Sequence, residues 1–164
     1  MGREVRRVPA DWEHPKVNDS YIPLFGDSFS TAAAEWDAGN QKWKEGFRDD
    51  YDGGWKPLDG SEEVTTYAKW TGERPVEADY MPDWPEEERT HYQMYETCTE
   101  GTPISPVFAT PEELARWLTN NGASAFASQT ASYDGWLRVC RGGFAPMAVM
   151  DGKGLRSGVE ALTD

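Results

Sequence analysis

Four side chains in this 164-residue sequence could ligate a transition metal or act as nucleophiles: His14, His91, Cys98 and Cys140. Zinc accepts both imidazole nitrogen and thiolate sulfur, so the four could in principle form a tetrahedral site. Structural zinc sites usually contain close pairs of Cys or His, however, and no such pair occurs here. We therefore expect no metal and no other cofactor, and we expect two free thiols rather than a disulfide.

A catalytic site is a second hypothesis, because His91 could act as a general base beside the carboxylate of Glu96 or the thiol of Cys98. The polar and apolar residues of segment 91–97 alternate, which predicts a β-strand. In a regular strand, residues separated by an odd number of positions point to opposite faces, so His91 faces away from both candidate partners. It would share its face with Tyr95 and Thr97 instead.

The common catalytic motifs are also missing from the sequence, which contains no phosphate-binding Walker loop, no dinucleotide glycine fingerprint and no nucleophile elbow. We therefore expect a protein that is not an enzyme. The alternative is a small enzyme or nucleotide-binding protein that uses His91, Tyr95 or Glu96.

Acidic residues are concentrated in the middle of the chain, whose net charge is −13. Residues 49–100 contain fifteen acidic and four basic residues, whereas residues 101–164 contain six and five. The acidic loop at residues 48–60 lacks the register of an EF-hand, which argues against a calcium site. This charge would repel a phosphate backbone, so we expect no direct binding of nucleic acid, and a basic protein surface is the better match. The alternative is that the charge only maintains solubility.

The sequence contains eight tryptophans, and their positions divide them into two groups. Trp36, Trp43, Trp117 and Trp136 lie on predicted helix faces and are expected in the core. The other four, at positions 12, 55, 70 and 84, lie in or beside acidic loops. An aromatic ring flanked by carboxylates can bind Arg or Lys through cation–π contact and ion pairing. The predicted partner-binding residues are Asp49, Asp50, Asp52, Trp55, Trp84, Glu86, Glu87 and Glu88.

These side chains would be positioned by a loop-rich α+β domain, with three or four helices packed on a small, mainly antiparallel sheet. Helices are expected from Ser28 or Ser30 to about residue 45, and over residues 61–72, 110–120 and 132–142. Strands are expected near residues 4–8 at a sheet edge, and over 91–97, 104–108 and 144–150. We expect residues 1–150 to form one domain and residues 151–164 to form a mobile tail.

The third of these helices has the clearest signal. Thr110 has the chemistry of an N-cap, Pro111 suits the first helical position, and Glu113 completes a capping box. Leu114, Trp117 and Leu118 follow at spacings that predict an apolar face, so Trp117 is expected to be buried.

The N-terminal sequence offers no sign of export or membrane insertion. No apolar run approaches the roughly 20 residues that cross a bilayer, and the arginines at positions 3, 6 and 7 precede no apolar segment. We therefore expect a cytoplasmic protein.

Four short motifs together resemble a known group of proteins. They are Arg6-Arg7-Val8-Pro9 with Trp12-Glu13-His14-Pro15, His91-Tyr92-Gln93-Met94-Tyr95-Glu96-Thr97, Glu100-Gly101-Thr102-Pro103-Ile104-Ser105-Pro106-Val107-Phe108, and Gly142-Gly143-Phe144-Ala145-Pro146. The sequence resembles, over most of its length, small uncharacterised proteins of tailed phages and prophages. The resemblance implies a bacterial host cytoplasm during infection or lysogeny. It supplies no catalytic residues, because the family has no agreed activity.

Small phage accessory proteins of this kind include inhibitors of host defence, among them anti-CRISPR proteins. The leading hypothesis is therefore an accessory protein that binds and inhibits a host protein by presenting an acidic, aromatic surface to a basic nucleic-acid-binding site. The alternatives are the enzyme or nucleotide-binding protein around His91 and a component of the virion or of its assembly.

Overall fold

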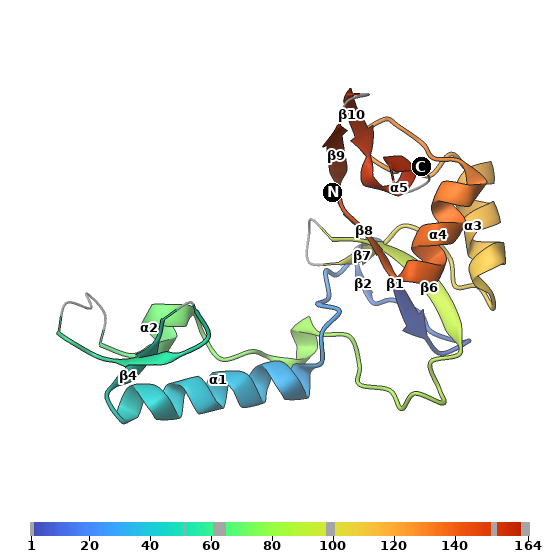
Figure 1. Cartoon of the computed structure of the whole chain (residues 1–164). Coiled ribbons are helices and arrows are strands. Elements are labelled where there is room, and N and C mark those ends of the chain that lie inside the picture. The colour runs from blue at the N-terminus through green and yellow to red at the C-terminus, as the bar shows by residue number, and fades with distance from the viewer. Residues whose placement is uncertain (1, 51, 61–64, 98–100, 152–153, 162–164) are drawn as a thin grey trace. The chain divides into compact units, whose positions relative to one another are not determined.

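The computed structural model describes residues 2–50, 52–60, 65–97, 101–151 and 154–161, and it has the expected α+β architecture (Figure 1). The chain divides into two compact units. The sheet unit contains residues 1–26 and 84–164, and the inserted unit contains residues 27–83. Among the described helices, none is long and apolar enough to cross a membrane.

The sheet unit is built on four antiparallel strands in the order β7-β6-β1-β8. Strand β1 (Arg3–Val8) pairs along its whole length with β6 (His91–Glu96), and its first two residues also pair with β8 (Phe144–Ala145). The prediction of an edge strand at residues 4–8 is therefore wrong for this part of β1. Pro9 lies just beyond the strand, so its missing N–H does not prevent pairing on either side.

The strand predicted over residues 104–108 is shorter in the structure and begins nearer the N-terminus. Strand β7 covers Thr102–Pro103, and the pairing with β6 then continues through isolated contacts between Ile104 and Met94 and between Phe108 and Tyr92. Pro106 has no backbone N–H to donate, which explains the interruption. The antiparallel pairing of the two segments is as predicted.

Two helices pack side by side in the sheet unit, α3 (Pro111–Asn120) and α4 (Tyr133–Gly142) (Figure 1). The capping chemistry predicted for α3 is confirmed, because Thr110 Oγ1 accepts a hydrogen bond from the backbone N–H of Glu113 at 3.2 Å. Ser132 caps α4 in the same way. The core between helices and sheet contains Met94, Leu114, Ala115, Leu118, Ala125, Trp136, Val139, Cys140, Ala145 and Val159.

Trp117 is not in this core, which corrects the prediction. Its side chain is half-buried at the margin of α3, where it packs against Phe108 with ring centroids 6.1 Å apart. Trp136 on α4 is fully buried, as predicted.

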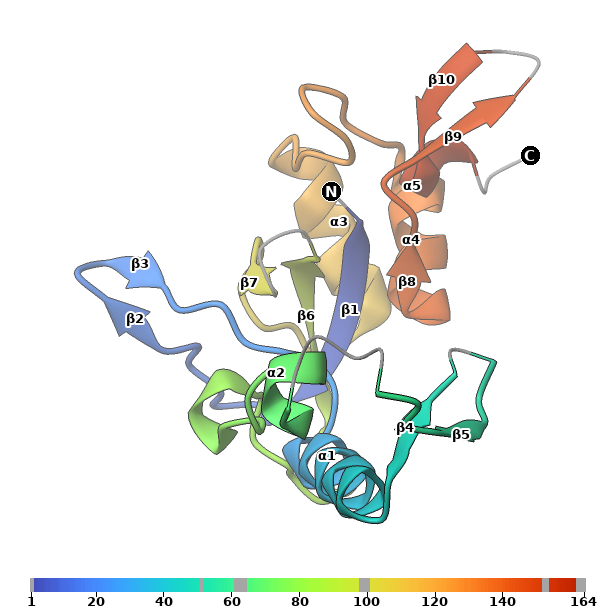
Figure 2. The same cartoon turned by 90° about the vertical axis from the view of Figure 1, so that its left-hand side faces the viewer.

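The C-terminal region differs from the predicted mobile tail. Strands β9 (Ala148–Asp151) and β10 (Gly154–Ser157) form a hairpin, and the short helix α5 (Gly158–Ala161) follows it (Figure 2). Val159 is buried in the core, and the carboxylate of Glu160 accepts hydrogen bonds from Ser132. Packing of Val159 against α4 thus anchors a segment whose glycines had indicated mobility.

Residues 10–26, for which no helix or strand was predicted, also contain regular structure. Strands β2 (Lys16–Val17) and β3 (Ser20–Tyr21) form a hairpin whose two turn residues, Asn18 and Asp19, both have positive φ. Two positive φ angles are typical of the type I′ turn, and Asn and Asp tolerate them well.

The inserted unit contains α1 (Phe29–Lys44), the hairpin of β4 (Phe47–Asp49) and β5 (Trp55–Pro57), α2 (Tyr67–Thr71) and a 3-10 turn, η1 (Glu77–Asp79). Helix α1 matches its prediction and is capped by Ser28. Helix α2 begins at Tyr67, later than expected, because Thr66 caps it. The predicted start at residues 61–63 lies outside the described residues.

Aromatic rings form the centre of the inserted unit. The ring of Tyr67 lies 5.4 Å from that of Trp36 and 6.1 Å from that of Trp43, which in turn lies 5.8 Å from Trp70. At the unit's two ends, the hydroxyls of Ser28 and Ser30 donate to the carboxylate of Asp83. These contacts all lie within residues 27–83, and of the four aromatic side chains that of Trp43 is buried while the other three are half-buried.

Replacement of Trp136 and of Trp117 should distinguish a residue of the core from one at its margin. Trp136→Ala should lower the free energy of unfolding by about 3–5 kcal/mol, because it empties a fully buried site. Trp117→Ala should cost less than half as much, since part of its ring already contacts water. Urea denaturation followed by circular dichroism measures both. Equal losses in the two variants would contradict this assignment of the core.

Gly39 in α1 provides a test of the aromatic centre of the inserted unit. A Cβ at this position would overlap the phenol ring of Tyr67, which neighbouring tryptophans hold in place. Gly39→Ala should therefore destabilise the unit, although alanine in a helix is intrinsically favoured over glycine by about 1 kcal/mol. Hydrogen exchange of the α1 amides measures the effect, with exposed Ala38→Gly as the control for propensity. Slower exchange in Gly39→Ala than in the wild type would contradict the packing.

Candidate functional site

The structure divides the predicted partner-binding residues between the two units. Asp49, Asp50, Asp52 and Trp55 belong to the inserted unit, whereas Trp84 and Glu86, Glu87 and Glu88 belong to the sheet unit. The two groups are therefore separate candidate surfaces.

Within the inserted unit, two of the predicted carboxylates accept intramolecular hydrogen bonds. Asp49 accepts a hydrogen bond from the indole N–H of Trp70 at 2.9 Å. Asp50 accepts the backbone N–H groups of Asp52 and Gly54 at 3.1 and 2.8 Å, which organises the turn. Their carboxylates therefore have intramolecular roles. Asp52 remains exposed, and 45% of Trp55 is exposed.

In the sheet unit, Glu86 forms ion pairs with Arg7 and Arg89, and the ring of Trp84 packs edge-on against Trp12 at 4.7 Å. Glu87 and Glu88 are exposed. Ion pairing at Glu86 reduces the charge that this group offers to a partner, an effect that the sequence pattern alone could not reveal.

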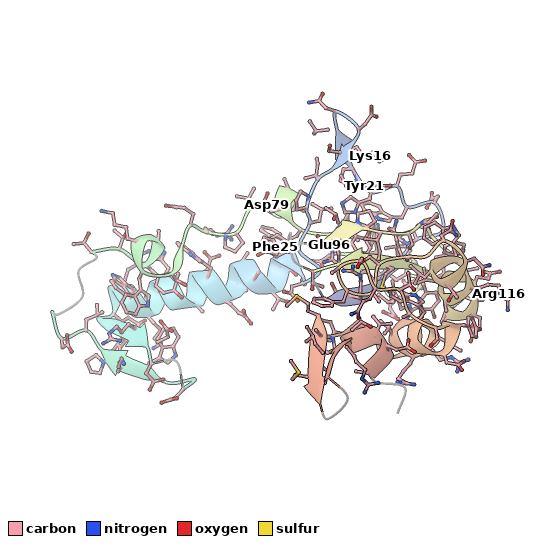
Figure 3. All side chains as sticks on the ribbon, turned by 90° about the horizontal axis from the view of Figure 1, so that it is seen from above. Lys16, Tyr21, Phe25, Asp79, Glu96 and Arg116 are labelled. Carbon is pink, nitrogen blue, oxygen red and sulfur yellow. The ribbon has the colours of Figure 1, made fainter. Side chains whose placement is uncertain are left out.

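The sequence analysis missed most of the available carboxylates of the inserted unit. Six exposed carboxylates there have no hydrogen-bond or ion-pair partner among the described residues: Asp27, Glu35, Asp52, Glu73, Glu77 and Asp79. Fourteen acidic and six basic residues give this unit a net charge of −8, compared with −5 for the longer sheet unit. Figure 3 labels Asp79 among these side chains. A charge count within spatial units, rather than along the sequence, would have found them.

Three of the four side chains considered for a metal, His14, His91 and Cys140, lie in the described part of the chain. No cluster of three or more His, Cys, Asp or Glu side chains suited to a metal occurs within the described parts of the chain. Cys140 is a free, buried thiol whose pKa burial raises to about 12. Cys98 lies outside the described residues. His91 hydrogen-bonds to its neighbour Thr90 at 2.9 Å.

The sheet unit has a cleft of about 840 Å³ that the sequence analysis did not anticipate. Its walls come from residues 12–21, from β6 and residues 103–107 beside it, and from α3; they include Trp12, Tyr21, Gln93, Pro103, Ser105 and Trp117. Figure 3 labels Lys16 and Tyr21, the cross-strand pair on the β2–β3 hairpin. The Asn18-Asp19 turn signal could have revealed this hairpin.

Beneath the cleft, a hydrogen-bond network converges on the hydroxyl of Tyr95. It accepts the indole N–H of Trp12 at 3.1 Å and donates to the side-chain oxygen of Gln93 at 2.7 Å. The amide nitrogen of Gln93 donates to the backbone carbonyl of Ser105 at 2.8 Å. The network therefore joins residues 12–14 and residue 105 to β6.

His14 is buried in this network. Its Nε2 lies 2.6 Å from the carbonyl oxygen of Ile22 and must donate, which leaves Nδ1 facing the Tyr95 hydroxyl at 3.2 Å. Burial lowers the pKa of His14, the hydrogen bond to Ile22 opposes that shift, and the charge of Arg6 adds to it. The imidazole is therefore neutral at pH 7.

Tyr95 is unsuited to proton transfer near neutral pH, which bears on the enzyme hypothesis. Burial raises the pKa of its hydroxyl to about 12. The guanidinium of Arg6 lies 4.3 Å from the centroid of the Tyr95 ring, and the side chain of Tyr95 is fully buried. Glu96 is also buried. It lies an odd number of positions from His91, and the regular pairing of β6 therefore places the two side chains on opposite faces of the sheet, as predicted.

Comparison with known protein families, curated proteins and solved structures finds no match.

The buried imidazole predicts a specific pH dependence of stability. Because the pKa of His14 is lower in the folded chain than its ordinary value of 6.5, the unfolded chain takes up a proton first as the pH falls. The contribution of this group to the free energy of unfolding should be fully present above pH 6.5. Below pH 6.5 it should decrease by at most about 1.4 kcal/mol per pH unit. Urea denaturation of wild type and His14→Gln between pH 5 and 7.5 measures the effect. His91 is present in both proteins, so identical pH profiles would show that His14 does not titrate in this way.

Proposed function

We propose that this protein is a non-enzymatic binding protein whose inserted unit docks on a basic protein surface, of the kind that normally binds nucleic acid. The observation that carries this proposal is the group of six exposed carboxylates without a partner among the described residues of the inserted unit.

The charge of the inserted unit suits attraction at a distance. A net charge of −8 in 57 residues produces a negative field that increases the rate at which a basic partner is encountered. The same field repels phosphate, so the proposal excludes direct binding of nucleic acid.

Exposed apolar side chains supply a contact that charge alone does not. Trp55 and Phe47 lie on the β4–β5 hairpin, and 45% and 36% of their surfaces are exposed. Tryptophan is common among the residues that dominate binding energy at interfaces, and its ring can cover an arginine side chain. Asp49, which pairs with Trp55 across the hairpin, adds a negative charge beside it.

The resemblance to phage proteins supports a more specific role. In a host bacterial cell, a protein that occupies the nucleic-acid groove of a defence complex would inhibit that complex. We therefore propose an anti-defence inhibitor, with anti-CRISPR activity as the specific case.

The proposal predicts that binding depends on the free carboxylates and Trp55 together. A variant with Asp52→Asn, Glu77→Gln, Asp79→Asn and Trp55→Ala should associate about tenfold or more slowly at low salt, since several charges steer the encounter. Each single charge change should have little effect, because one exposed ion pair is worth under about 1 kcal/mol. The partner is first captured from a nuclease-treated bacterial lysate and purified, and its association rates are then measured across a salt series.

The matched control neutralises three exposed carboxylates of the sheet unit: Asp11→Asn, Glu87→Gln and Glu88→Gln. This variant should bind nearly as well as the wild type. Duplex DNA or structured RNA should compete for the partner. Equal loss of binding in both variants, or a complex that nucleic acid does not displace, would contradict the proposal.

A further inference from the structure

We propose that the cleft of the sheet unit binds an extended, proline-rich peptide segment that carries a basic residue. This site is separate in sequence and in chemistry from the acidic surface proposed above. It is defined by the aromatic walls between residues 12–21, residues 103–107 and α3.

The walls combine aromatic rings with prolines. Trp12 and Tyr21 come from residues 12–21 and Trp117 from α3, and Pro103 and Pro106 lie among them. Aromatic-lined grooves recognise polyproline II segments because the ligand helix is already formed and loses little entropy on binding. The hydrogen bond from Trp12 to Tyr95 holds one wall in place before any ligand arrives.

The extent of the cleft favours a chain over a compact small molecule. A second hollow of about 560 Å³ shares Val107 and Trp117 with it and continues to His91 and Arg116. Trp117 therefore borders two consecutive depressions. A polyproline II segment advances about 3.1 Å per residue, so a peptide of several residues spans such a surface while a small ligand fills one part of it.

The rim also offers hydrogen-bond donors. A polyproline II peptide has no internal hydrogen bonds, and its carbonyl groups must find donors elsewhere. The hydroxyl of Tyr21, in a side chain 40% exposed, and the indole N–H of Trp117 have no hydrogen-bond partner within the described part of the structure. Both are attached to the rings that would contact the prolines.

Charge favours a basic over an acidic peptide through the net charge of the unit, because the lining itself is balanced: Glu13 and Glu113 are matched by Lys16 and Arg116. Glu13 at the rim is exposed and has no partner among the described residues. The ammonium group of Lys16 lies 4.4 Å from the ring centroid of Tyr21, on the same hairpin. The net charges of the sheet unit, −5, and of the chain, −13, attract a cationic segment and disfavour an anionic ligand such as a nucleotide.

The test uses the full chain and two synthetic probes, a ten-residue proline peptide ending in arginine and the same peptide ending in glutamate. Binding is followed by NMR of the tryptophan indole N–H groups, assigned by substitution. The arginine peptide should shift Trp12 and Trp117 saturably. Tyr21→Phe should weaken binding by about threefold through one lost hydrogen bond, and Trp117→Ala by about tenfold or more. Glu13→Gln should reduce the preference for arginine over glutamate.

Trp55→Ala, in the inserted unit, is the matched control and should bind like the wild type. The Tyr21→Phe variant retains its ring, so its fold is not at risk. The proposal is overturned if millimolar arginine peptide shifts neither indole, if the two cleft variants bind like the wild type, or if the glutamate peptide binds as tightly as the arginine peptide. Each of these results would leave the acidic-surface proposal untouched, because that proposal is tested with different variants and a different partner.

Discussion

The hydroxyl of Tyr95 is the group on which the organisation of the sheet unit depends. It has one proton and three polar neighbours, the side chains of Trp12, His14 and Gln93. Without it, the indole N–H of Trp12 and the side-chain oxygen of Gln93 would lose a hydrogen-bond partner, and an unsatisfied buried polar group costs about 1–3 kcal/mol. The network therefore supplies the reason that residues 10–26 lie against the sheet despite having little regular secondary structure.

Arginine packing around the same tyrosine adds a second constraint. The guanidinium of Arg6 lies over the Tyr95 ring, pairs with Glu4 at 3.0 Å and donates to the carbonyl of Leu24 at 2.7 Å. Gly101, at φ +95°, leaves room for this group, since a Cβ there would overlap Arg6 and Leu24. A buried cation that is paired and hydrogen-bonded in this way specifies one arrangement of the segments around it. Arg6 thereby holds the backbone at Leu24 beside β1.

Local patterns predicted the elements whose formation depends on neighbouring residues. Helices α1 and α3 and strand β6 were predictable, because caps and periodic apolar residues determine them within one segment. The interior position of β1, the packing of Val159 and the division into two units depend on contacts between distant residues. The periodicity of apolar residues along the sequence does not reveal such contacts.

The same distinction applies to the candidate sites. The sequence identified the acidic character of the middle of the chain, but it could not show that Asp49 and Asp50 are committed to a hairpin while Glu77 and Asp79 are available. It also could not show that His14, Gln93 and Tyr95 meet, because 79 or more positions separate His14 from the other two. Both proposed surfaces are therefore assembled by the fold rather than encoded in a linear motif.

The central claim is that the Tyr95 hydroxyl holds residues 12–14 against the sheet, and hydrogen exchange of the Trp12 indole N–H in a Tyr95→Phe variant tests it most directly. This substitution removes one oxygen and retains the ring over which Arg6 packs. The account predicts faster exchange and a shifted resonance for the Trp12 indole, with the amides of β1 and β6 still protected. An indole N–H that exchanges as slowly in the variant as in the wild type would contradict it.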